Sequence, residues 1–550
     1  MKRYLTAFLV IWIAGAGLTI RVWGLNRYYF NPDEIMHLVI SSSATLADIQ
    51  ETNQEHTHAP LMYWLFHFWM KISRNEIFLK SISLGSGTAL IVVSFLLGRK
   101  ASGALAGLVM ALLVAFSYGA TLLSEVVRPY MLETAFLSLA LLFLIRYWQG
   151  AGRKSAWAYA VFMFLAIATQ YSAVIPAAAI GLVWFGRAVG QRRLRQEGGF
   201  AILLYLVLVT AVLALFFPQV HAVLESRRFQ HTVSGYLAPH FLETWSEIGG
   251  HLWSLYTYLF LPPLATLFLV LSLLGALALI RTSRLEIPLI VVLTLLLNSI
   301  LALLKYYPLG GARQCAFYLP LATLLVGAAF QYGYDAIRKF SSARAGFLSG
   351  QGKKLEKASL GAGTMGVLLA TVLIGAWYEK WDFLRNYPFP DPWAKFEFCL
   401  TRQNYTRVLQ YLEQKVPQND VVVSNAGTSN YILWATQQSG LLVGREFVTP
   451  MDFQGRTIYF VHTWGFLNQN LLRSTFEKLA RKKLLTPSTT LWLFNIGFRD
   501  LAHQTAADPL LRGAVQQTLV LEGSYLYALD SAAILSGLQK TKHRRRMESR

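Results

Sequence analysis

Long apolar stretches separated by short polar ones fill most of the first 377 residues. Eleven of the stretches approach the roughly 20 mostly apolar residues that a membrane-spanning helix requires. They cover residues 4–23, 81–97, 103–123, 131–147, 156–171, 172–185, 200–217, 252–280, 286–304, 314–334 and 360–377. The sequence therefore predicts a polytopic α-helical membrane protein with about eleven transmembrane helices. The count stays open at residues 156–185, because both stretches there are short and Pro176 interrupts the second.

Two loops between the predicted spans, residues 24–80 and 218–250, are too long to be simple turns. The first contains Leu61–Trp69, an apolar and aromatic stretch that is too short to cross a membrane. Such a segment is suited to lie as a helix in the membrane interface. We expect interfacial helices in both loops, where they could cover a cavity and guide a lipid into it.

The pattern changes after residue 377, which separates a predicted transmembrane domain (1–377) from a C-terminal domain (378–550). Strand-like runs at 420–424, 457–461 and 490–495 alternate with helix-like runs at 428–438 and 468–483. Strands that alternate with helices indicate a small α/β domain. The basic run at 542–546 is expected to be a disordered end.

Charge supports the membrane interpretation and predicts an orientation. The chain is 54% hydrophobic and 14% charged, whereas soluble proteins carry about 25% charged residues. The net charge of +21 arises in short runs between apolar stretches, which argues against a nucleic-acid partner. Basic residues concentrate in short cytoplasmic loops. The runs at 99–100, 146–154, 187–195, 281–284 and 338–357 then predict a cytoplasmic N-terminus and an extracytoplasmic C-terminal domain, in the cell inner (plasma) membrane.

Asn31-Pro32-Asp33-Glu34 places two carboxylates just after the first predicted span. Ionisable groups at a lipid boundary lose hydration and rarely persist without a partner or a task. One of them could act as a general base toward a hydroxyl or amine, because low polarity raises the proton affinity of a carboxylate. The alternative is that both are solvated loop charges. His58 is the preferred functional histidine of this loop, and Glu34 and His58 are candidates for a divalent metal, although His56-Thr57-His58 matches no structural zinc pattern.

Two other turns on the same predicted side carry cations. Residues 124–133 include Glu125, Arg128 and Tyr130, and residues 305–314 include Lys305 and Arg313. Arginine offers the bidentate geometry that phosphate favours, and two adjacent glycines in the second turn permit close backbone approach. An anionic head group could bind here. The simpler alternatives are an ion pair within the first turn and an ordinary tight turn in the second.

Taken together, these segments resemble the GT-C glycosyltransferases related to protein O-mannosyltransferases and to the aminoarabinose transferase that modifies lipid A, specifically their bacterial branch. The likeness rests on Asp33-Glu34, on His58-Ala59-Pro60-Leu61, on the turn from Ser124 to Leu132 and on Gly310 to Pro320. It covers roughly residues 1–339. The resemblance implies a GT-C fold and an inverting transfer of a sugar from a polyprenyl-phosphate carrier to a lipid, glycan or protein acceptor outside the cytoplasmic membrane.

The resemblance also implies roles for individual residues. Asp33 would be the base or the acceptor-orienting carboxylate, and Glu34 would support it or help to hold a divalent ion. Arg128 and Arg313 would hold the carrier phosphate. Tyr130 stands where some relatives have a second acidic residue, and which of the nearby glutamates replaces it is left open. No cofactor is assigned with certainty, and a divalent metal ion remains an alternative.

Two other functional classes stay open. A transporter or lipid flippase would place charges and broken helices near the middle of the bilayer in paired halves, whereas here the ionisable groups gather at one side. A receptor or assembly protein would recognise partners through its C-terminal domain, which leaves Asp33, Glu34 and Arg313 without a role. The enzyme hypothesis is the one that uses all three.

Overall fold

The computed structural model describes two compact units. One, the membrane unit, comprises Met1–Leu25, Asn53–Met62 and Ile77–Pro392, and the other, the second unit, comprises Asn26–Thr52, Tyr63–Glu76 and Trp393–Arg550. The residues described are 2–25, 30–53, 59–190, 200, 203–212, 237–260, 262–347, 410–411, 414–417, 420–425, 434, 448–453, 456–463, 469–496, 511, 513–521 and 524–548. The predicted domain boundary at 377/378 lies outside them.

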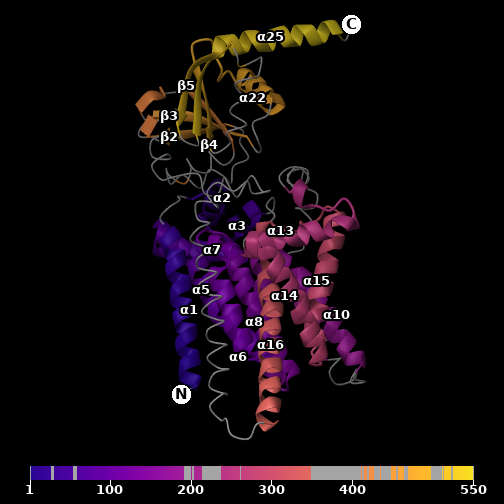
Figure 1. Ribbon diagram of the computed structural model, residues 1–550. Helices are drawn as coiled ribbons and strands as arrows, with labels where there is room; N and C mark the ends of the chain where they lie inside the picture. The colour runs from indigo at the N-terminus through magenta and orange to yellow at the C-terminus, as the bar shows by residue number, and fades with distance from the viewer. Residues whose placement is uncertain are drawn as a thin grey trace. The chain divides into compact units, whose positions relative to one another are not determined.

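The membrane unit is a bundle of long apolar helices (Figure 1). Its elements are α1 (Lys2–Leu25), α5 (Glu76–Ala101), α6 (Ala104–Phe116), α7 (Tyr118–Ser124), α8 (Tyr130–Trp148), α9 (Arg153–Thr169), η1 (Tyr171–Ala173), α10 (Val174–Gly190), a helix at Leu203–Val212, η3 (Ala238–His240), η4 (Trp245–Glu247), α13 (Ile248–Phe260), α14 (Pro262–Arg281), α15 (Glu286–Leu303), η5 (Arg313–Tyr318) and α16 (Leu319–Phe347). The α helices run up and down the bundle, and α13 lies across one end. We call that end the Leu25 end, because α1 finishes there, and the opposite end the Lys2 end.

Seven helices of the described residues are long and apolar enough to cross a membrane, and the bent pair α6 and α7 makes an eighth. The predicted polytopic membrane fold is therefore confirmed. Of the other predicted spans, 156–171 is α9 with 17 residues, 200–217 is described only at Leu203–Val212, and 360–377 lies outside the described residues. The predicted span 252–280 is wrong as a single helix, because α13 ends at Phe260 and α14 begins at Pro262, where proline suits the first turn of a new helix.

Small residues allow the membrane helices to pack closely. A Cβ atom on Gly98 of α5 would lie 2.9 Å from the Gly107 backbone of α6, and one on Gly275 of α14 would lie 1.8 Å from the Leu325 carbonyl oxygen of α16. A Cβ on Gly327 of α16 would meet the Ala106 carbonyl oxygen of α6 at 2.8 Å. Close backbone approach at small residues is how helices associate where no water drives them together. These contacts hold α5, α6, α14 and α16 as a rigid frame.

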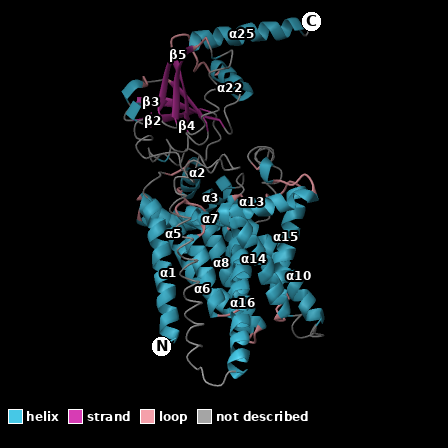
Figure 2. Cartoon of the chain, in the orientation of Figure 1, coloured by secondary structure: helices cyan, strands magenta, loops and turns pink. Residues whose placement is uncertain are grey.

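The second unit combines three short helices with a six-stranded sheet. The helices are α2 (Pro32–Ser41), α3 (Leu46–Asn53) and α4 (Leu61–Ile72), and the strands are β1 (Val421–Asn425), β2 (Val448–Phe453), β3 (Arg456–Thr463), β4 (Thr490–Ile496), β5 (Val515–Leu521) and β6 (Ser524–Asp530). The strand order is β2-β3-β1-β4-β6-β5, as the magenta arrows of Figure 2 show in one sheet. The central strands β3, β1 and β4 are parallel, and the outer strands are antiparallel to their neighbours.

Two helices cover one face of this sheet, α22 (Gln469–Arg481) and α25 (Ser531–Glu548). Phe476 of α22 and Ile534 of α25 are fully buried against alternate residues of β1 and β4, such as Val423 and Leu493. The predicted α/β character of this region is confirmed, with β1, β3, β4 and α22 close to their predicted ranges. The predicted helix at 428–438 lies outside the described residues, apart from Trp434.

The predicted disorder of the basic run 542–546 is wrong, because α25 continues through it to Glu548. The cause lies upstream of the charges. Ile534, Leu535 and Leu538 pack against the sheet core, and a helix anchored in this way can extend into a polar sequence at little additional cost.

Candidate functional site

Asp33 and Glu34 lie in the first turn of α2 rather than in a loop. Asn31 is the N-cap residue: its side-chain oxygen accepts a hydrogen bond from the Glu34 amide at 2.9 Å, and Glu34 Oε2 accepts one from the Asn31 amide at 2.7 Å. Pro32 at the first helical position fixes the backbone for this start. Glu34 is buried and Asp33 is half-buried. One oxygen of Glu34 therefore serves the helix cap, and Asp33 stands in the same capped first turn.

The next turn of α2 is anchored to α4. The His37 ring is fully buried and stacks on the Tyr63 ring, with centroids 4.8 Å apart. One turn further, the Ser41 carbonyl oxygen lies 3.0 Å from Nδ1 of His67. The predicted interfacial stretch Leu61–Trp69 is thus a helix, and its polar groups help to orient the segment that carries Asp33.

His58 and His56 lie outside the described residues, so their placement relative to Glu34 stays a prediction. Among the residues that are described, no group of three or more His, Cys, Asp or Glu side chains gathers as a metal site would require.

Arg128 lies in the turn between α7 and α8, at the Leu25 end of the membrane unit. The turn is held by a backbone hydrogen bond from Arg128 to Val126 at 2.9 Å and by Ser83 Oγ of α5, which donates to the Arg128 carbonyl oxygen at 3.2 Å. The Arg128 guanidinium lies 5.7 Å from the centre of the Tyr130 ring. Arg128, Tyr130 and Glu125 are all buried. The structure thus places a cation under protein cover at a helix end, where its charge is weakly screened.

The turn 305–314 at the same end is fastened to α13 and to the segment before it. Lys305 Nζ donates to the Leu242 carbonyl oxygen at 2.8 Å and to the Glu243 carboxylate. His251 Nδ1 lies 2.8 Å from the Leu309 carbonyl oxygen. Lys305 is thus hydrogen-bonded to neighbouring protein groups, and its side chain is partly exposed. Its predicted part in substrate binding stays a prediction.

Gly310 and Gly311 do allow close backbone approach, and the partner is α13. Gly310 has φ of +116°, which other residues rarely adopt. A Cβ on Gly311 would lie 2.6 Å from Ser254 Oγ and 2.8 Å from the Ser254 carbonyl oxygen, and the Gly311 amide donates to Ser254 Oγ at 3.1 Å. Arg313 follows at the start of η5 and is buried. The tight turn therefore delivers Arg313 into the interior of the Leu25 end.

Arg21 is a buried cation that the sequence analysis did not single out. Its guanidinium donates to the carbonyl oxygens of Gly17, Ala115 and Val114, each at 2.9 Å, and to Ser124 Oγ at 3.1 Å. Two of these carbonyls lie in the last turn of α6, next to the bend of 58° between α6 and α7. Carbonyls at a helix end lack helical partners, so Arg21 satisfies the groups that the bend leaves open. The sequence signal that could have revealed Arg21 is that it is a single arginine inside the otherwise apolar stretch 4–23.

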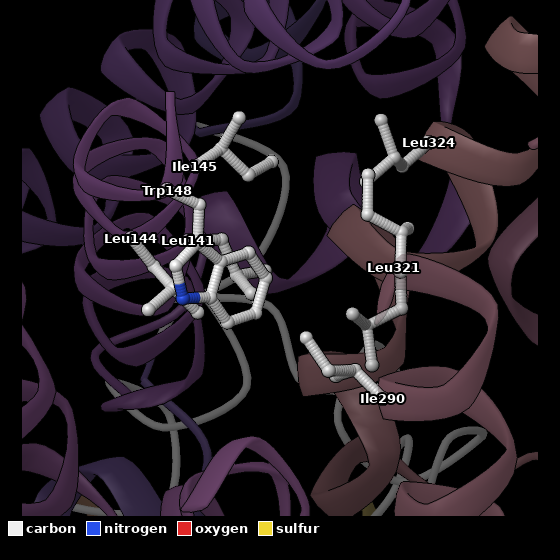
Figure 3. Close-up of a pocket in the computed structure, with 8 residues that line it drawn as sticks. Leu141, Leu144, Ile145, Trp148, Ile290, Leu321 and Leu324 are labelled. Carbon is white, nitrogen blue, oxygen red and sulfur yellow. The ribbon is translucent and has the colours of Figure 1, made fainter. Parts of the chain in front are cut away.

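An apolar hollow lies between the last turns of α8, the first turn of α15 and the first turns of α16 (Figure 3). Figure 3 shows Trp148 and Leu144 on one side and Leu321 and Leu324 on the other. All of its lining side chains are aliphatic or aromatic, the others being Leu141, Ile145, Ile287 and Ile290. None of these side chains is an acid, a base or a phosphate ligand.

Five of the predicted site residues thus occupy the Leu25 end of the membrane unit: Glu125, Arg128, Tyr130, Lys305 and Arg313. Both α7 and α8 contact η5, which brings the Arg128 turn and the Arg313 turn to neighbouring positions. Asp33 and Glu34 belong to the second unit. The convergence of Asp33 with the two arginines stays a prediction.

Comparison with solved structures identifies the fold of this bundle. ArnT from Cupriavidus metallidurans bound to undecaprenyl phosphate superimposes with a TM-score of 0.52 at 15% identity, over 94% of this chain and 97% of that one. The archaeal oligosaccharyltransferase AglB from Archaeoglobus fulgidus, in complex with an inhibitory peptide and a dolichol-phosphate, gives a TM-score of 0.54 at 12% identity, over 96% and 74%. The chain has the GT-C fold. No protein-family model and no curated protein matches the sequence.

Proposed function

We propose that this GT-C protein is a membrane glycosyltransferase that moves a sugar from a polyprenyl-phosphate donor to a lipid, glycan or protein acceptor, with inversion at the anomeric carbon. The observation that carries the proposal is the burial of Arg128 and Arg313 in adjoining turns at one end of the bundle. Both similar structures were determined with a polyprenyl-type lipid phosphate. A lipid phosphate keeps its apolar tail in the membrane and brings an anion to the boundary, so it requires buried cations at a helix end.

In the proposed reaction the acceptor attacks the anomeric carbon from the face opposite the phosphate. The Asp33 carboxylate accepts the proton of the acceptor hydroxyl or amine as the new bond forms. The bond from the anomeric carbon to the phosphate oxygen breaks, and its electron pair leaves with the lipid phosphate. Arg128 and Arg313 stabilise the negative charge that develops there, and such stabilisation supplies a large share of the rate enhancement in preorganised sites.

Glu34 takes a supporting role in this proposal. Because its Oε2 holds the Asn31 amide, Glu34 fixes the first turn of α2 and thereby the direction in which Asp33 points. Tyr130, whose ring lies beside the Arg128 guanidinium, orients that cation. The protein would act at the cell inner membrane, with the Leu25 end on the extracytoplasmic side.

The test is transfer of a labelled sugar from undecaprenyl phosphate by the purified full-length chain. Wild type is compared with Asp33→Asn, and Asp48→Asn serves as a matched control because Asp48 is likewise half-buried and its carboxylate accepts a hydrogen bond from the Thr45 amide at the start of α3. We expect transfer to fall by about a hundredfold or more in Asp33→Asn and to stay unchanged in the control. Undiminished transfer by Asp33→Asn would reject the assigned base. Movement of labelled lipid across vesicles without any transfer would favour a flippase.

A further inference from the structure

Glu133 is a buried carboxylate that the proposed reaction does not use. It lies one turn after Tyr130 on α8 and is fully buried. Ser172, in the short turn η1 between α9 and α10, donates its hydroxyl hydrogen bond to Glu133 Oε1. Acidic side chains within membrane helices are costly and are retained where they pair or serve a function. Glu133 therefore requires an explanation beyond packing.

The surroundings of Glu133 connect it to η5. Burial raises the pKa of the Tyr307 phenol well above its usual range, and the neighbouring Glu133 carboxylate raises it further, while a hydrogen bond with Ser172 opposes the rise. The Tyr307 hydroxyl also donates to the Gln314 carbonyl oxygen at 3.1 Å. Gln314 directly follows Arg313. Ser172 and Tyr307 thus both adjoin Glu133, and Tyr307 connects this cluster to the first turn of η5.

A further buried polar group lies near Glu133, at the start of α8. Within the part of the protein that the structure describes, Glu133 Oε2 and the Tyr130 hydroxyl are buried and have no hydrogen-bond partner. The two residues are three apart on one helix, so they share a face. Among the described residues, the Glu133 carboxylate is therefore hydrogen-bonded through one oxygen, which accepts from Ser172.

We propose that Glu133 is a positioning residue, which holds η5, and with it Arg313, at a fixed distance from the turn that carries Arg128. The inference rests on the proposed function, because it takes both arginines as ligands of the donor phosphate. A phosphate bound by two cations requires a defined spacing between them. Glu133 of α8 is hydrogen-bonded to η1, and both α8 and η1 contact η5, so Glu133 lies among the elements that carry or adjoin the two turns. Loss of the Glu133 carboxylate would weaken binding of the lipid phosphate and leave the acceptor site unchanged.

The experiment measures binding and kinetics on the full-length protein in detergent. The variants are Glu133→Ala, Glu133→Gln and Ser172→Ala, and the probe for binding is undecaprenyl phosphate without a sugar. Ser138→Ala is the matched control, because Ser138 is buried on the same helix and its hydroxyl donates only within α8, to the Thr134 carbonyl oxygen at 2.7 Å. Kd for the probe, KM for the sugar donor, KM for the acceptor and kcat are determined for each.

We expect Glu133→Ala and Ser172→Ala to raise Kd for the probe and KM for the donor by about tenfold, the effect of losing one well-placed hydrogen bond to a charged group. KM for the acceptor should not change. Glu133→Gln keeps an oxygen that accepts from Ser172 and should stay within about threefold of wild type. Ser138→Ala should equal wild type.

A different pattern overturns the inference. If Glu133→Ala lowers only kcat or the folded fraction, with Kd and donor KM unchanged, Glu133 has a purely structural role. If Glu133→Ala does not fold, Ser172→Ala decides the question by the same criterion. Failure of wild type to bind the probe or to transfer any sugar would instead reject the proposed function, and this inference with it.

Discussion

The two ends of the membrane unit handle charge in opposite ways. At the Lys2 end the cations stand at helix ends and none that we name is fully buried: Arg99 and Lys100 in the last turn of α5 and Arg146 in the last turn of α8 are exposed, and Arg187 in the last turn of α10 is half-buried. At the Leu25 end the helices are interrupted at Ser117 and at η1 and η5, and Arg21, Arg128 and Arg313 are buried. Cations at a helix C-terminus stabilise it through the helix dipole and need no other purpose. Cations buried beside broken helices require protein partners or a ligand.

The breaks in the helices are physically connected to the buried arginines. A continuous helix satisfies its own backbone, so it has no carbonyl group to offer a buried guanidinium. The bend between α6 and α7 exposes the Val114 and Ala115 carbonyls, and Arg21 takes both. The comparison teaches that a break in the helices at the Leu25 end supplies backbone partners for a buried cation, which a regular helix end does not do.

The most decisive test of the difference between the two ends removes one arginine from each end. Arg313→Ala should lower sugar transfer by about 100- to 1,000-fold, because a buried charge opposite the leaving phosphate is lost. Arg146→Ala should leave transfer within about twofold, because Arg146 is exposed and its guanidinium lies only over the Phe143 ring, 5.4 Å from its centre. Initial rates at equal amounts of folded protein provide the measurement. Similar losses in the two variants would refute the distinction between the ends.

A second test addresses stability at the bend. Arg21→Met should lower the free energy of unfolding by about 3 kcal/mol, since buried carbonyls lose their donors. Thr19→Val is the control: Thr19 is exposed on the same helix, and its hydroxyl donates to the Gly15 carbonyl oxygen at 3.0 Å. Thermal unfolding in detergent compares the two variants. An Arg21 variant as stable as the control would show that the bend does not depend on this cation.

A third test sharpens the role of the tight turn before Arg313. Gly311→Ala should cost about 1–3 kcal/mol of stability, because the added methyl group would lie 2.6 Å from Ser254 Oγ and 2.8 Å from its carbonyl oxygen. Donor KM should rise in the same variant as η5 shifts. Gly333→Ala in α16 places its methyl group in open space and should stabilise the helix slightly, by about 0.5–1 kcal/mol. Equal behaviour of the two variants in unfolding and in KM would count against the turn as a positioning device.

The smallest effect is expected at the Lys2 end. Arg187 of α10 pairs with Glu286 of α15, and their side chains are 21% and 24% exposed. Partly exposed ion pairs contribute little, so Arg187→Gln and Glu286→Gln should each change the free energy of unfolding by about 1 kcal/mol or less. Sugar transfer should be unaffected. A double-mutant cycle that yielded a coupling several times larger, or any loss of transfer, would show that this end also takes part in function.

The sequence predicted the membrane spans well because length and apolarity alone determine them. Tyr4–Trp23, Ser81–Leu97 and Met131–Tyr147 all lie within observed helices. The bend at Ser117 was missed, because the residues on both sides are apolar and the span 103–123 has the length of one helix. Arg21 was missed for a related reason, since its partners are backbone carbonyls that no side-chain pattern reveals.

The sequence identified the residues of the candidate site more reliably than it predicted the local structure around them. Arg128 and Arg313 were selected as cations beside turns, and the structure finds both buried at one end of the bundle. Glu34 was taken for a functional carboxylate in a loop, although Asn31 followed three residues later by Glu34 is the pattern of a capping box. The contact of Gly311 with Ser254 could not be predicted, because it joins residues 57 positions apart.

The bend between α6 and α7 also limits how far this part of the protein extends across the membrane. The 13 residues of α6 rise about 20 Å along the helix axis, and the seven residues of α7, tilted by 58°, add about 5 Å in the same direction. The neighbouring α5, with 26 residues, rises about 39 Å. This column of the protein is therefore shorter than the roughly 30 Å thickness of a bilayer's hydrocarbon layer. In the proposed reaction, this shortening would let the phosphate of the donor lipid reach the Arg128 turn while the lipid tail stays in the hydrocarbon layer.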